Sequence, residues 1–227
     1  MEVPFPMLVA CWSVKGGAGT TVVSASLALL LAQRAPGGAV LADLAGDLPA
    51  ALGLPEPDSA GLCAWLAAGE SAPADSLGLL EVAVAPGLAL LPRGEGPLAP
   101  ERAGLLAALL DSSPRPAVVD CGRPDGADPA GSAAVAAVVA GARRSLLVIR
   151  PCYLGLRRAM QAPLRPSGVV VVNEPGRALT TDDIRQVIPA PVLAEVPLDP
   201  AVARAVDAGM LAGRMPRSLA RALSRAA

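Results

Sequence analysis

Short apolar runs alternate along this 227-residue chain with longer stretches that have the composition of helices. Uninterrupted apolar runs that stop at glycine, proline or a charged residue are typical of buried parallel strands. The predicted strands are Met7–Val14, Ala39–Asp43, Ala117–Asp120, Ser145–Ile149, Gly168–Asn173 and Val192–Val196. The range 79–91 contains a Pro-Gly turn at 86–87 and predicts either a hairpin or two edge strands.

Helices are predicted in most of the intervals between these strands. The predicted helices are Thr20–Arg34, Leu48–Leu54, Gly61–Ala68, Glu101–Leu110, Ala130–Ala140, Thr181–Val187, Pro200–Ala208 and Pro216–Ala226. Alternating strands and helices indicate an α/β fold, a doubly wound and mostly parallel sheet with helices on both faces. Because no internal repeat or long linker divides the chain, residues 1–227 are predicted to form one domain that ends in the helix 216–226.

The composition excludes several kinds of chemistry. Hydrophobic residues make up 53% of the chain but aromatic residues only 2%, so Ala, Leu and Val must build the core. The absence of histidine excludes a Ser–His–Asp triad, a His-ligated metal and a His general base. A net charge of -1 excludes a globally basic nucleic-acid binder, although a local basic face remains open.

The cysteines and the termini favour a cytoplasmic protein. The four cysteines are far apart in sequence and form no C-x-x-C pair, so free thiols in a reducing compartment are expected. The N-terminal MEVPFPMLVACW lacks the basic and small-residue features of a signal peptide. No stretch reaches the ~20 uninterrupted apolar residues that a membrane-spanning helix needs.

The segment Ser13–Thr21, SVKGGAGTT, joins the first predicted strand to the first predicted helix. Gly16, Gly17 and Gly19 allow backbone N–H groups to face a phosphate, and the N-terminus of the following helix adds positive potential. A glycine turn that only packs helix against strand is the alternative. We expect a phosphate-binding loop, with the backbone of residues 16–21 around the phosphates.

Two aspartates, Asp43 and Asp120, stand at the carboxyl ends of predicted strands. Ligands of doubly wound sheets bind at these ends. We therefore expect Thr21 to offer its hydroxyl to Mg²⁺ and Asp120 to hold the ion through water. Of the 19 basic residues only Lys15 is a lysine, and it lies inside the glycine loop.

The loop SVKGGAGTT resembles the deviant Walker A motif, usually K-G-G-x-G-K-T, of the ParA/MinD group of P-loop ATPases. The segment Ala42–Asp47 is similar to the group's D-x-D motif, and AVVDCG to its Walker B strand. The resemblance implies ATP or ADP with Mg²⁺, bound by Lys15, Gly16, Gly17, Ala18, Gly19, Thr20 and Thr21, with Asp43 and Asp120 also at the metal. It further implies that Lys15 and Asp43 are catalytic, that Lys15 reaches across a nucleotide-dependent homodimer, and that Asn173 contacts the base.

Two positions depart from the pattern of this group. Thr20 stands where the usual loop lysine contacts the β- and γ-phosphates, and Ala45 stands where the second acid of D-x-D positions the attacking water. Asp47 is two residues further on and cannot be assumed to replace that acid. We therefore expect nucleotide binding with weak or absent hydrolysis.

The same loop is also similar to that of the divergent CpaE/TadZ branch, which localises pilus assembly machinery. The turn at Arg93 and the segment RPCY, Arg150–Tyr153, are similar to that branch as well. This implies a positioning protein with a partner in pilus, secretion or division machinery, recruited to the pole, septum or inner membrane face. A slow ATPase for chromosome or plasmid partition and a nucleotide-free scaffold are the alternatives.

Two further surfaces allow more than one interpretation. The C-terminal helix is expected to pack on the domain through Leu219 and Leu223. Weak contact with a membrane is the alternative. Arg143, Arg144, Arg157 and Arg158 are expected to be solvated helix ends, with non-specific DNA binding as the alternative that is not favoured.

Overall fold

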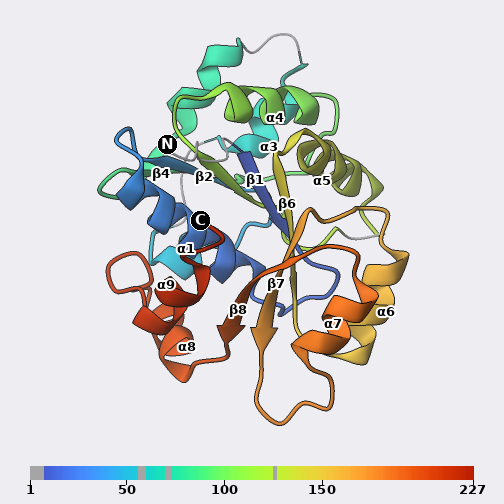
Figure 1. Ribbon diagram of the computed structural model, residues 1–227. Coiled ribbons are helices and arrows are strands. Elements are labelled where there is room, and N and C mark those ends of the chain that lie inside the picture. Colours follow the sequence, from blue (N-terminus) through green and yellow to red (C-terminus); the bar gives the residue numbers. More distant parts are fainter. Residues whose placement is uncertain (1–7, 56–59, 70–72, 125–126) are drawn as a thin grey trace, which may run out of the picture.

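The computed structural model describes residues 8–55, 60–69, 73–124 and 127–227. Its centre is an eight-stranded sheet with the order β3-β4-β2-β5-β1-β6-β7-β8 (Figure 1). The strands are β1 (Leu8–Trp12), β2 (Ala39–Asp43), β3 (Val82–Ala85), β4 (Leu88–Leu91), β5 (Ala117–Asp120), β6 (Arg144–Ile149), β7 (Gly168–Asn173) and β8 (Val192–Pro197). All neighbouring strands are parallel except the hairpin of β3 and β4, which lies at one edge.

The strand order reverses at β1, which lies between β5 and β6. Cys11 of β1 pairs in register with Asp120 of β5, and Trp12 pairs with Leu147 of β6. In a sheet of this kind, a crevice for ligands opens beyond the carboxyl ends of the strands where the order reverses. The segment that follows β1 therefore lies at the position where a ligand is expected.

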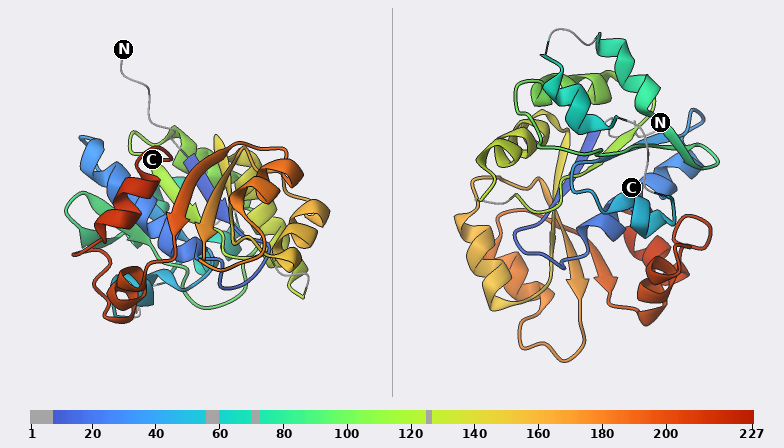
Figure 2. Two further views of the ribbon diagram at one scale, coloured as in Figure 1. Left: turned by 60° about the horizontal axis from the view of Figure 1, so that its bottom comes forward. Right: turned by 180° about the vertical axis from the view of Figure 1, so that it is seen from behind.

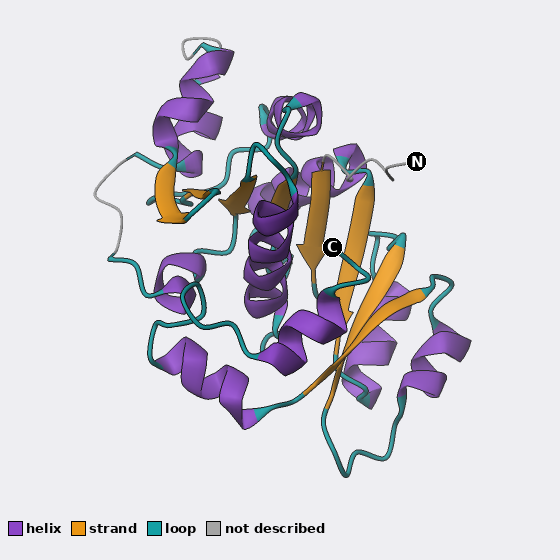
Figure 3. Ribbon diagram, turned by 60° about the vertical axis from the view of Figure 1, so that its left-hand side comes forward, coloured by secondary structure: helices purple, strands orange, loops and turns teal. Residues whose placement is uncertain are grey.

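Helices cover both faces of the sheet, so the predicted fold class is confirmed (Figures 1 and 2). On one face lie α1 (Thr20–Arg34), α2 (Leu48–Leu52), α8 (Pro200–Asp207) and α9 (Arg217–Leu223). On the other lie α3 (Leu62–Ala67), α4 (Ala103–Ser112), α5 (Pro129–Gly141), α6 (Tyr153–Gln161) and α7 (Thr181–Val187), together with the 3₁₀ helix η2 (Ala74–Leu80). Figure 3 shows α1 running along the strands in front of the sheet.

Each face has its own apolar core, built mainly from Ala, Leu and Val as the composition requires. The strands supply both cores because successive side chains point to opposite faces. Trp12 and Trp65 are buried, and their indole N–H groups donate to Ser145 Oγ at 2.9 Å and to Ser76 Oγ at 3.1 Å. Cys11, Cys63 and Cys121 are buried free thiols, as expected, and Cys152 is a half-buried one.

Helix α6 was not predicted from the sequence. Its composition is polar, with two adjacent arginines, and only Gly155 and Leu156 are buried. Its N-terminus is capped by a thiol, since Cys152 Sγ accepts from Gly155 N at 3.3 Å. The predicted helix 216–226 is also too long at its C-terminal end, because α9 stops at Leu223 and a turn follows. Met7, the first residue of the predicted first strand, lies outside the described residues.

Candidate functional site

The segment between β1 and α1 forms an open loop around three glycines. Gly17 and Gly19 have φ angles of 72° and 95°, in the left-handed region that side-chain-bearing residues rarely adopt. Side chains added at Gly16 or Gly17 would have no neighbour within 4 Å, so this part of the backbone faces free space. Gly19 directly precedes α1, whose first N–H groups therefore point toward the same space.

The loop is anchored to the segment that follows β5. Ser13 N donates to Gly122 O at 2.8 Å, and Ser13 Oγ lies 3.3 Å from both Gly122 O and Lys15 O. These bonds tie the carboxyl ends of β1 and β5 together. The loop is therefore held in one shape by the sheet.

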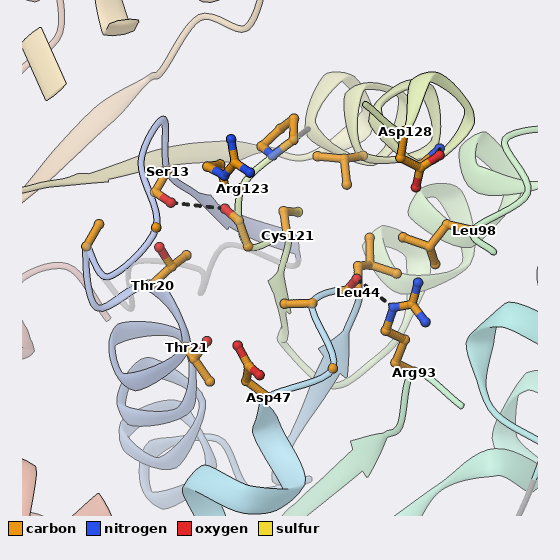
Figure 4. Close-up of a pocket in the computed structure, with 18 of the residues that line it drawn as sticks. Ser13, Thr20, Thr21, Leu44, Asp47, Arg93, Leu98, Cys121, Arg123 and Asp128 are labelled. Carbon is orange, nitrogen blue, oxygen red and sulfur yellow. Dashed lines mark hydrogen bonds between the residues drawn. The ribbon is translucent and has the colours of Figure 1, made fainter. Parts of the chain in front are cut away.

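A cavity of about 590 Å³ opens in front of the loop (Figure 4). Four segments enclose it: the loop with the start of α1, residues 44–47 after β2, residues 93–98 after β4, and residues 121–124 and 128–135 after β5. The side chains that give it polar character are Ser13, Thr20, Thr21, Asp47, Arg93, Arg123 and Asp128.

Asp120, the last residue of β5, directly precedes the cavity residues Cys121 and Gly122 and is itself buried, with 0% of its surface exposed. Its Oδ1 accepts from Gly122 N at 3.2 Å, whereas its buried Oδ2 has no hydrogen-bond partner among the described residues. Burial raises the pKa of this carboxyl to about 7; the Thr21 hydroxyl opposes this shift and the Asp43 charge adds to it. A buried carboxylate oxygen without a partner, next to a threonine hydroxyl, fits a hard divalent cation such as Mg²⁺.

Asp43 lies beside Asp120 in the sheet register, but its side chain is used locally. Oδ1 accepts from Ala45 N at 2.9 Å and Gly46 N at 2.6 Å, and Oδ2 accepts from Leu48 N at 3.1 Å. Burial raises the pKa of this carboxyl, and the three backbone bonds oppose that shift. Neither Asp43 nor Asp120 lines the cavity directly, and the observed contacts of Asp43 shape the 44–48 turn.

Asp47 is an exposed carboxylate that lines the cavity, and Figure 4 shows it facing Thr21. It adds a repulsive charge to both Asp43 and Asp120 and raises their pKa values. Ala45, at the position of the second acid of D-x-D, also lines the cavity and offers only a methyl group. The fold thus brings Thr21 and Asp47 into one cavity, with Asp120 buried beside it.

Four charged cavity residues, Asp47, Arg93, Arg123 and Asp128, are absent from the site predicted from the sequence. Arg93 Nε donates to Leu44 O at 3.2 Å and its Nη1 to Gly96 O at 3.0 Å, so this side chain supports the 44–47 segment. In the sequence, the turn at Arg93 was noted only because it resembles the CpaE/TadZ branch, and no pattern pointed to Arg123. Both enter the cavity because their loops follow β4 and β5 at the same sheet edge.

Lys15 points away from the main cavity. It lines a separate small hollow of about 10 Å³ together with Gly16–Ala18, Arg150 and Cys152. Within the described part of the chain it forms no ion pair. The ammonium is thus not placed on the phosphates of its own loop.

A second large cavity, of about 470 Å³, lies on the other side of Gly19 and is mainly apolar. Val22, Val172 and Pro197 are among its lining residues. Asn173 is not: its Nδ2 donates to Thr181 Oγ1 and to Glu195 Oε2, both at 3.0 Å. The Asn173 amide is thus engaged by Thr181 and Glu195, and its contact with a base stays a prediction.

The described residues include no helix long and apolar enough to cross a membrane. They also include no group of three or more His, Cys, Asp or Glu residues arranged as a direct metal cluster. A cation at Asp120 would therefore need ligands beyond the carboxylates, such as the Thr21 hydroxyl, water or a bound ligand's oxygens.

Residues 9–212 match the family model described as the CobQ/CobB/MinD/ParA nucleotide binding domain. No curated protein matches the sequence significantly. Among solved structures, the septum site-determining protein MinD of Pyrococcus horikoshii, complexed with Mg-ADP, is 19% identical with a TM-score of 0.77, covering 96% of this chain and 93% of that chain. A ParA family ATPase of Chlorobium tepidum is 21% identical with a TM-score of 0.76, covering 95% of both chains.

A third solved structure is the MinC:MinD cell division protein complex of Aquifex aeolicus. The matched chain is 21% identical with a TM-score of 0.71, and the match covers 89% of this chain and 85% of that chain. At these identities the structural likeness establishes the fold.

Proposed function

Because the chain belongs to the family of CobQ/CobB/MinD/ParA nucleotide-binding domains, we propose that it binds ATP or ADP with Mg²⁺ and acts as a nucleotide-dependent switch. The observation that carries the proposal is the open glycine loop beside the unpartnered Asp120 Oδ2. The loop supplies backbone N–H groups for phosphates, and the Asp120 oxygen supplies a ligand atom for the metal. The similar MinD of P. horikoshii is a Mg-ADP complex.

The two cavities suggest how the nucleotide is oriented. The phosphates and Mg²⁺ belong in the polar cavity, with Thr21 and Asp120 at the metal and Asp47 near it. The base belongs in the apolar cavity beyond Gly19, where Val22 and Val172 offer flat apolar contacts. Asn173 would reach the base only after its side chain leaves Thr181 and Glu195.

The same site favours binding over turnover. Thr20 supplies no cation to the β- and γ-phosphates, and Ala45 supplies no carboxylate to the attacking water. Phosphoryl transfer is catalysed mainly by positioning and charge stabilisation, and the loss of one preorganised donor commonly costs about 10²–10³ in rate. Hydrolysis is therefore expected to be slow, and the loop is best described as a deviant Walker A motif.

The output of the switch is proposed to be a homodimer that presents a surface to a protein partner. Lys15 supports this because it is turned away from its own cavity and has no ion pair among the described residues. The partner is proposed to belong to pilus, secretion or division machinery, in keeping with a CpaE/TadZ-like branch. The MinD of A. aeolicus offers a parallel, since it is found in a complex with MinC.

Isothermal titration calorimetry with ATP and Mg²⁺, combined with a phosphate-release assay, tests the proposal. Saturable binding with turnover far slower than one per minute is expected, since two charged groups are missing. The absence of heat at millimolar ATP would leave only the nucleotide-free scaffold. Binding with sustained phosphate release and salt-sensitive DNA retention would identify a partition ATPase instead.

A further inference from the structure

Arg150, the first residue after β6, has an unsatisfied buried donor. The residue is half-buried, and its Nε is inaccessible to solvent without a hydrogen-bond partner. Within the described part of the chain Arg150 forms no ion pair. Buried polar groups in native proteins are almost always hydrogen-bonded, and those attached to a charge cost most when they are not. A ligand that is not part of the chain is therefore the expected partner.

The position of Arg150 indicates which ligand this is. The residue lines the small hollow behind Gly16–Ala18 and also the apolar cavity that begins at Gly19 and Val22. Val148 of the same strand packs in the core on the α1 face, so by strand alternation Arg150 projects toward that face. The guanidinium thus lies between the phosphate loop and the proposed base cavity.

No acid in the described part of the chain pairs with this arginine. Asp199 lines the same apolar cavity, but its Oδ1 accepts from Ala201 N at 2.8 Å and its Oδ2 from Ser218 Oγ at 2.7 Å. Asp207 also lines that cavity and forms no ion pair with Arg150. On the other side, the small hollow contains a second cation, Lys15. A guanidinium without an acidic partner, beside a loop of N–H donors, favours an anion at this place.

We propose that Arg150 binds phosphate oxygens of the nucleotide, and that it supplies from the end of β6 a cation in place of the one that Thr20 does not supply from the loop. This inference rests on the proposed nucleotide binding and adds a ligand residue to that site. Guanidinium is suited to the role because its planar fork bonds two phosphate oxygens at once. The backbone that carries it is fixed, since the sheet holds Ile149 and the Cys152–Gly155 cap starts α6 directly afterwards.

Competition binding with a fluorescent ADP analogue tests the proposal, with ATP, ADP and adenosine as competitors. We expect Arg150→Gln to weaken ATP and ADP binding by about tenfold to a hundredfold, the usual effect of losing a charge-assisted bond. Adenosine has no phosphate, so its affinity is expected to stay within about twofold of wild type. Arg157→Gln is the matched control, because it removes an exposed arginine from α6 and is expected to change none of the affinities.

Further variants keep the test decisive. Arg150→Lys retains the charge and is expected to recover part of the lost affinity, and circular dichroism melting verifies that each variant is folded. In a Thr20→Lys background, where a loop lysine is restored, the loss caused by Arg150→Gln is expected to shrink. An equal loss in both backgrounds would contradict the idea that one cation replaces the other.

The failure of this inference differs from the failure of the proposed function. If wild type binds ATP and Arg150→Gln binds it equally well, the phosphate contact is refuted and the switch stands. If adenosine loses as much affinity as ADP, Arg150 shapes the base cavity and the phosphate contact is again refuted. If wild type binds no nucleotide at all, both proposals fall together.

Discussion

Three aspartates near Thr21 differ in what their carboxylates contact. Asp43 accepts three backbone N–H bonds within its own turn. Asp120 is buried and keeps one oxygen unpartnered, and Asp47 is exposed on the cavity wall. Because three backbone N–H groups already occupy the Asp43 carboxylate, Asp47 and Asp120 have more free acceptor capacity for a bound metal.

We expect Asp47→Asn to change nucleotide affinity in opposite directions with and without Mg²⁺. With Mg²⁺ the variant loses a favourable charge near the metal, and affinity for ATP falls by about threefold to tenfold. Without Mg²⁺ it loses a charge that repels the phosphates, and affinity rises. Calorimetry in Mg²⁺ and in EDTA measures both. Asp75→Asn, an exposed site on η2, is the control, and equal shifts in both buffers would contradict the assignment.

A second prediction concerns stability and pH without ligands. Burial raises the pKa of Asp120 from 3.8 to about 7, so between these values the folded state binds more protons than the unfolded state. Raising the pH through this window therefore lowers the free energy of unfolding, and the loss is complete above about pH 7.

Asp120→Asn removes this titration. When the pH is raised from about 5 to about 8, wild type is expected to lose on the order of 2 kcal/mol of unfolding free energy that the variant does not lose. Urea unfolding followed by circular dichroism at the two pH values measures the difference. A stability difference that does not change with pH would show that the carboxyl ionises normally in the folded protein.

At the level of secondary-structure elements, the packing of α9 distinguishes a structural role of the C-terminal segment from membrane contact. Leu219 and Leu223 are buried in the core with α1, while Arg217, Arg221 and Arg225 are exposed. The apolar side of the segment is therefore already used inside the domain. Membrane contact through this side would require α9 to leave the core.

We expect Leu223→Ala to lower the free energy of unfolding by about 2–4 kcal/mol, the cost of lost apolar burial and a new cavity. Arg221→Ala on the same helix is expected to change it by less than about 0.5 kcal/mol. Chemical denaturation of both variants tests the packing. A small effect of Leu223→Ala would mean that α9 contributes little to the folded domain.

At the level of the whole molecule, the sheet order brings together loops that are far apart in sequence. The segments after β1, β2, β4 and β5 enclose one cavity, and those after β1, β6, β7 and β8 line the other. Lys15 belongs to neither of these two cavities. This placement suits a lysine whose partner lies on a second molecule.

We expect Lys15→Ala to bind ATP in the monomer within about threefold of wild type, because its ammonium is turned away from the cavity, but to lose nucleotide-dependent dimerisation. Sedimentation velocity with a non-hydrolysable ATP analogue and Mg²⁺ measures the dimer. Arg217→Ala, which removes an exposed cation from α9, is the control. A wild-type protein that stays monomeric with nucleotide would refute the dimeric switch.

The sequence by itself determined the fold class and the place of the loop. Strands buried on both faces must be continuously apolar, and glycines are needed where the backbone adopts positive φ, so both leave patterns that can be read locally. The carboxylates at the ends of β2 and β5 could be identified because each one ends such an apolar run. The polar helix α6 was missed because its burial rests on Gly155 and Leu156 alone and a cysteine caps it.

Only the tertiary structure decided which side chains have free atoms and which loops meet. Asp43 and Asp120 both end a strand in the sequence. Hydrogen bonds within a turn occupy the Asp43 carboxylate, whereas one buried oxygen of Asp120 has no partner among the described residues. Asp47 and Arg93 come from separate loops that meet at one cavity because β2 and β4 are parallel and adjacent, and Arg150 reaches the other cavity from the end of β6. Such proximity depends on strand order, which no local sequence pattern specifies.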